Sequence, residues 1–167
     1  VLWQASWSLA AHGHRDAARS YALRSVEIYR SRMEDGAMGC NESVLYALRA
    51  AELWSEYAEC AREMMERSEE GTWAHGSASC ALGIAKASLG DRAGAEAAIT
   101  GFLAEEDFFR AGYVAAYLGE LDRAVEYFRR GLTSESTRGY DHFTRWNLDL
   151  EPLWDYPPFR EMVGWDD

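Results

Sequence analysis

The chain has 167 residues, of which 48% are hydrophobic, so it is long and apolar enough to bury a core, which argues against intrinsic disorder. It carries 28 acidic and 17 basic side chains, giving a formal net charge of -11. This balance argues against nucleic acid and anionic membrane surfaces as partners, because both attract clustered Lys and Arg.

No apolar run is long enough to span a bilayer, and the first residues do not show the basic, apolar and small-residue pattern expected of a signal peptide. The three cysteines, Cys40, Cys60 and Cys80, are odd in number and form no CxxC pair. We therefore expect no disulfide framework, a reducing compartment and a cytoplasmic location. Cys60 is expected in the core, and Cys40, on a glycine-containing loop, is expected to be the exposed cysteine. Because the first residue is Val1 rather than Met, the chain is expected to be a piece of a longer protein.

Apolar residues at helical spacing predict four antiparallel helix pairs over residues 1–132. The pairs span about residues 1–32, 42–67, 73–103 and 106–132, and a C-terminal capping tail follows over 133–167. Asn41 is expected to cap the helix that follows it, and Ser55 to cap the second helix of its pair. A tight turn is expected at residues 105–107. The predicted fold is all-α, since no alternating strand pattern occurs.

Each predicted pair contains a break and, five positions later, a small residue: Gly13 and Ala18, Ser55 and Cys60, Gly90 and Ala95, Gly119 and Ala124. Two antiparallel helices approach closely only where side chains are small. The small residues, together with Gly83 and Gly112, are therefore expected to form gaps. Large neighbours are expected to fill these gaps, namely Tyr21, Ile99 and Phe128.

This recurring pattern resembles the tetratricopeptide repeat family over residues 1–132. The best copy contains Phe108, Ala111, Gly112, Ala124 and Phe128. It departs from the family pattern at Ala115, where an aromatic residue is usual, and at Ser136, where Pro is common. The resemblance implies a right-handed superhelical solenoid of about four helix pairs. It also implies a noncatalytic module that binds a peptide or a partner domain along its concave surface.

The tail has a resemblance of its own, to segments that end helical-repeat regions in large bacterial multidomain proteins, including some kinases, cyclases and transcriptional regulators. Such segments place a Pro-x-Phe stretch against the last repeat. In this chain the residues expected to pack there are Leu150, Leu153, Trp154, Phe159 and Met162.

In the family, the first helix of each pair lines the concave groove. Carried onto this sequence, that register selects Trp3, Trp7, Leu45, Arg49, Glu52, Cys80, Ile84, Phe109, Arg110, Tyr113 and Tyr117. Aromatic residues and Arg often carry the binding energy of protein interfaces. The aromatic members either bind a partner, or pack in the core or against a neighbouring domain, and the sequence leaves both alternatives open.

No catalytic, cofactor-binding or metal-binding set emerges. His12 and His14 flank a predicted turn without an obvious third ligand, and a solvated turn explains them better than a metal site. We therefore expect a protein or peptide partner, with homo-oligomers as a further option, and no enzyme activity. The alternatives are a spacer or self-association domain of a larger bacterial signalling protein and, third, an enzyme or ligand-binding helical domain.

Overall fold

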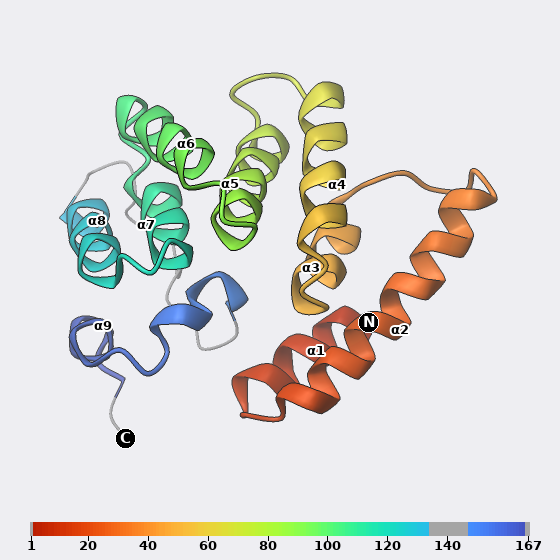
Figure 1. Cartoon of the computed structure of the whole chain (residues 1–167), viewed down its shortest axis with the longest axis horizontal. Helices are drawn as coiled ribbons and strands as arrows, with labels where there is room; N and C mark the ends of the chain where they lie inside the picture. The colour runs from red at the N-terminus through yellow and green to blue at the C-terminus, as the bar shows by residue number, and fades with distance from the viewer. Residues whose placement is uncertain (1, 134–146, 166–167) are drawn as a thin grey trace. The chain divides into compact units, whose positions relative to one another are not determined.

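The computed structural model describes residues 2–133 and 147–165 (Figure 1), and within them the regular structure is entirely helical. The all-α prediction is thus confirmed. The described elements are nine α-helices and one 3-10 helix: α1 (Leu2–Ala11), α2 (Arg15–Glu34), α3 (Glu42–Ala50), α4 (Trp54–Arg67), α5 (Trp73–Ser88), α6 (Arg92–Ala104), α7 (Phe108–Tyr117), α8 (Leu121–Thr133), η2 (Leu148–Leu153) and α9 (Pro157–Val163).

The chain divides into two compact units, Val1–Ala85 and Lys86–Asp167, and the boundary falls inside α5. In the first unit α1 packs on α2, α2 on α3, and α3 on α4; in the second, α6 packs on α7 and α7 on α8. The helices of these pairs therefore bury apolar side chains against a neighbour in the sequence. Among the described residues no helix is both long and apolar enough to cross a membrane.

Of the two helix caps predicted from the sequence, one is confirmed and the other is wrong. Asn41 caps α3, because its side-chain oxygen accepts hydrogen bonds from the backbone N–H groups of Ser43 and Val44 at 2.9 and 3.3 Å. The Ser55 prediction is wrong, since α4 already begins at Trp54 and Ser55 lies in its first turn. The tight turn at residues 105–107 is confirmed. Glu106 adopts a φ of 56° there, between the end of α6 and the start of α7.

We predict that Asn41→Ala lowers the free energy of unfolding of the first unit by about 1 kcal/mol, because two backbone donors at the start of α3 lose their partner. Urea unfolding followed by circular dichroism measures the change. Asn41→Asp is the matched control, since its carboxylate keeps the cap and loses only the hydrogen bond from the Asn41 amide to the Gly39 carbonyl oxygen, and it should lose less stability than Asn41→Ala. Equal losses for the two variants would contradict the assignment.

The predicted role of small residues at helix crossings is confirmed in the second unit. A Cβ atom built on Gly112 of α7 would lie 2.5 Å from the ring of Phe128 on α8, so the ring occupies the gap that the glycine leaves. Ala95, Ile99 and Ala124 are fully buried. In the first unit Ala18 is buried as well, but Tyr21 is 43% exposed, so the expectation that it fills a gap is wrong.

The described part of the tail packs on α7 and α8 within the second unit. The hydroxyl of Tyr117 donates to the carbonyl oxygen of Leu148 at 3.0 Å, and the side-chain amide of Asn147 donates to the Tyr113 hydroxyl at 3.3 Å. The Phe159 ring meets Phe128 at a centroid distance of 5.8 Å. Three of the five residues expected to pack from the tail are fully buried and two are half-buried: Leu150, Leu153 and Phe159, then Trp154 and Met162.

Candidate functional site

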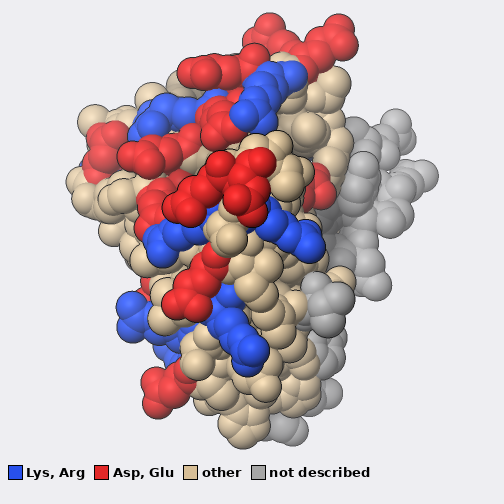
Figure 2. Space-filling model, turned by 90° about the vertical axis from the view of Figure 1, so that its right-hand side faces the viewer, with Lys and Arg blue, Asp and Glu red and all other residues tan. Residues whose placement is uncertain are grey.

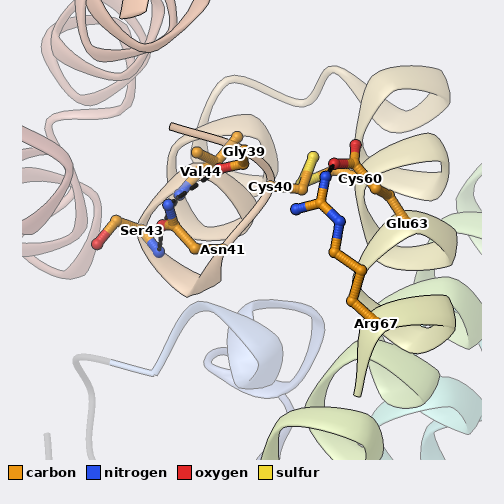
Figure 3. Close-up of a disulfide and its surroundings, with 8 residues drawn as sticks. All are labelled: Gly39, Cys40, Asn41, Ser43, Val44, Cys60, Glu63 and Arg67. Carbon is orange, nitrogen blue, oxygen red and sulfur yellow. Dashed lines mark hydrogen bonds and ion pairs between the residues drawn. A yellow bond between two sulfur atoms is a disulfide. The ribbon is translucent and has the colours of Figure 1, made fainter. Parts of the chain in front are cut away.

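A disulfide between Cys40 and Cys60 joins the loop after α2 to the middle of α4 (Figure 3). The two Cα atoms lie 5.3 Å apart, within the usual range for such a bond. The expectation that the cysteines form no disulfide is therefore wrong, and Cys40 is not an exposed free thiol. The spacing of the cysteines in the sequence could not show this pairing, because the two cysteines meet only once α3 packs against α4. Cys80 is the remaining, buried cysteine.

The loop that carries Cys40 is held on both sides of the cysteine. The side-chain amide of Asn41 donates to the carbonyl oxygen of Gly39 at 3.1 Å, while Asn41 also caps α3. On the other side, the Arg67 guanidinium lies against Gly39 and forms an ion pair with Glu63 (Figure 3). A larger residue than Gly39 would displace Arg67. The loop is thus fixed to α4 by a covalent bond and by packing.

Beside the disulfide, the first unit contains a hollow of about 540 Å³, counting the space at its open mouth. Its floor is apolar and buried, formed by Val26 of α2, Val44 and Leu48 of α3, and Cys60 of α4. Its walls and rim are half-buried or exposed, formed by Tyr29, Arg30, Met33, Cys40, Glu56, Glu59 and Glu63. An apolar base with a few polar groups at the edge is the usual composition of a binding pocket.

The rim is acidic, because three carboxylates of α4 face one guanidinium of α2. Glu56, Glu59 and Glu63 follow each other at helical spacing, so they lie on one face of α4. Arg30 reaches across from α2, and its Nη2 atom lies 2.6 and 2.7 Å from the two carboxylate oxygens of Glu56. The hydrogen bond to Glu56 raises the pKa of Arg30 above its usual value. Both partners of this pair line the hollow.

Glu59 differs from its two neighbours on the rim. Glu56 is paired with Arg30, and Glu63 with Arg67. Glu59 lies between them, is exposed, and forms no ion pair with any residue of the two described stretches. Its carboxylate is therefore the one at this rim that a ligand can reach without displacing an arginine.

The face of the molecule drawn in Figure 2 mixes both signs of charge. Figure 2 shows Asp and Glu side chains interspersed with Arg over the face turned toward the viewer. The basic side chains on such a surface are largely neutralised by acidic neighbours, as Arg30 is by Glu56. An anionic ligand finds no concentrated basic patch on this face.

The predicted groove residues of the first unit occupy three different environments. Trp3 and Trp7 are half-buried and pack on each other and on Tyr46, with ring centroids 4.8–5.7 Å apart. Glu52 is exposed at the turn between α3 and α4, with a φ of 58°. The others are in the core, with exposed fractions of 0–7%: Leu45, Arg49, Cys80 and Ile84.

The predicted groove residues of the second unit contact the protein's own core and tail. Phe109 and Tyr113 are only 5% and 6% exposed. Arg110 forms an ion pair with Asp107, the cap of its own helix. Tyr117 donates its hydroxyl hydrogen to Leu148 of the tail. These contacts correspond to the packing alternative that the sequence left open. Among the predicted groove residues of the first unit, Trp3, Trp7 and Glu52 are the ones that are not buried.

The hollow beside the disulfide was not predicted from the sequence. One signal for it was present, namely the helical spacing of three glutamates in α4, although glutamates on a solvated helix face have the same spacing. In the described ranges, no three or more His, Cys, Asp or Glu side chains are grouped so that they could hold a metal ion. Comparisons with protein families, with curated proteins and with solved structures find no match to this chain.

Proposed function

We propose that this chain is a noncatalytic protein-interaction module, with its helix pairs arranged like those of a tetratricopeptide-type solenoid, and that it binds a segment of a partner protein in the hollow of the first unit. The observation that carries the proposal is the solvent-open hollow of about 540 Å³ with an apolar floor. Ligand sites commonly combine such an apolar base with a few polar groups at the edge.

The surroundings of the hollow support a preformed site. Helices α2, α3 and α4 each contribute lining residues, and the disulfide fixes the loop between α2 and α3 to α4. A site held in its binding shape before the ligand arrives loses less conformational entropy on binding. The half-buried cluster of Trp3, Trp7 and Tyr46 offers additional aromatic surface in the same unit.

Self-association is the second candidate function, favoured by apolar side chains on the outside of α2. Tyr21 and Ile28 are 43% and 42% exposed and lie seven residues apart, hence on one face of the helix. The cytoplasmic location stays a prediction. It was inferred from cysteines expected to form no disulfide, and the Cys40–Cys60 bond removes that support, because disulfides are typical of oxidising compartments.

A selection of random peptides displayed on phage against the immobilised whole chain tests the proposal. We expect convergent peptide sequences whose synthetic versions slow amide hydrogen exchange in α2, in the loop containing Cys40 and in α4. Met33→Trp, which places a large ring in the hollow, should weaken their binding at least tenfold, whereas Leu132→Trp on the exposed side of α8 should not. Protection confined to other helices would contradict the proposal, and a mass that rises with concentration would favour self-association.

A further inference from the structure

We infer that the partner segment bound in the hollow contains an arginine next to an apolar side chain, with the guanidinium on Glu59 and the apolar group on the floor. This inference rests on the proposed function and specifies the chemistry of the partner. Two independent features of the hollow carry it, namely the charge of its rim and the composition of its floor and walls.

The charge of the rim selects a cation. Three carboxylates and one guanidinium line the hollow, and that guanidinium, on Arg30, is already bound by both carboxylate oxygens of Glu56. The exposed carboxylate of Glu59 then remains for a ligand. The net charge of -11 on the whole chain attracts cationic segments over a longer range. An acidic segment would instead be repelled by both the rim and the chain.

The protein already displays the pairing that the inference assigns to the ligand. Arg30 and Glu56 form a two-pronged pair in which Nη2 and Nε of the guanidinium donate to the carboxylate oxygens. Arginine makes such pairs through a planar fork of donors, which the ammonium group of lysine cannot reproduce. Glu59 lies one turn further along the same face of α4 and can accept an equivalent fork.

The walls and floor add an apolar requirement. The half-buried Tyr29 lines the same hollow, and a guanidinium can stack on the face of a tyrosine ring. Met33 forms another part of the wall, and its flexible thioether adapts to different apolar shapes. Below them, Val26, Val44 and Leu48 form an apolar surface that a hydrated ion alone would leave unfilled. An arginine with an apolar neighbour satisfies both parts of the hollow.

The test measures fluorescence anisotropy of a short fluorescein-labelled peptide in which arginine and leucine alternate between glycine-serine ends. We expect Glu59→Gln to weaken binding about three- to tenfold, since it removes one partly exposed charged hydrogen-bond acceptor. Glu66→Gln is the matched control, because Glu66 is exposed on the same helix and outside the hollow, and its loss removes the same charge. It should change binding less than twofold.

Three further probes complete the experiment. Peptides with citrulline in place of arginine, or serine in place of leucine, should each bind at least tenfold more weakly than the parent peptide. Free arginine amide should bind far more weakly than either. Equal losses for Glu59→Gln and Glu66→Gln, full binding of the citrulline peptide, or tight binding of arginine amide would overturn the inference. Phage-selected peptides that protect the hollow but lack arginine would also overturn it, while leaving the proposed function intact.

Discussion

Phe128→Ala is expected to lower the free energy of unfolding of the second unit by about 3–5 kcal/mol, the usual loss when a buried phenylalanine is truncated. Phe128 is fully buried, and its ring lies 5.4 Å from Tyr113 and 5.8 Å from Phe159, measured between centroids. One ring therefore holds α7, α8 and α9 together. Urea unfolding gives the total loss, and hydrogen exchange measured by peptide assigns it to the second unit.

The control for this prediction lies on the same helix. Leu132 is 50% exposed, so Leu132→Ala should change the free energy of unfolding by less than about 0.5 kcal/mol. Gly112 supplies a second check, because a Cβ atom there would meet the Phe128 ring. Gly112→Ala should destabilise the wild type more than it destabilises a Phe128→Leu background. Similar losses for Phe128→Ala and Leu132→Ala would show that the ring does not organise this unit.

The helices and their packing partners follow from local sequence. Caps, glycines and apolar periodicity act over one to five residues, so Asn41, Gly90 and the turn at Glu106 mark real helix boundaries. The contact between Gly112 and Phe128 is predictable for the same reason. Both residues occupy set positions in one helix pair, and a pair joined by a short turn has few ways to pack.

Errors arise where distant segments decide the outcome. The sequence does not distinguish which side of α2 is covered, and the structure leaves Tyr21 exposed while Val26 is buried. Tyr113 accepts a hydrogen bond from Asn147, and Tyr117 donates one to Leu148. Both partners lie in the tail, more than thirty positions further along the chain. No local pattern in α7 predicts these contacts with the tail. Choosing groove residues by their position in the repeat therefore does not take the contacts into account.

The candidate site is even less accessible to sequence reasoning. The hollow combines α2, α3, α4 and the loop that contains Cys40, and its volume depends on how these elements cross. The spacing of Glu56, Glu59 and Glu63 is visible in the sequence, yet a solvated helix face gives the same pattern. What distinguishes the two is Arg30, which reaches the rim from a different helix.

Loss of the disulfide is expected to have the second large effect, lowering the free energy of unfolding of the first unit by about 3 kcal/mol. The bond links residues separated by 20 positions, and closing a loop of that length restricts the unfolded chain by about this amount. Cys40→Ala is the preferred variant, because Cys40 is half-buried in a loop whereas Cys60 is in the core. Urea unfolding of the oxidised protein and of the variant measures the difference.

A reducing agent separates the effect of the bond from that of the side chain. Reduction should destabilise the wild-type chain to the level of Cys40→Ala and leave the variant unchanged, since the buried Cys80 takes no part in the disulfide. A variant as stable as the oxidised wild type would show that the bond does not constrain the unfolded chain.

Because Cys40 also lines the hollow, the same reduction should free one wall of the candidate site. Binding of the arginine-leucine peptide should therefore weaken on reduction in wild type and be insensitive to reductant in Cys40→Ala, which links the stability of the loop to the function proposed for it.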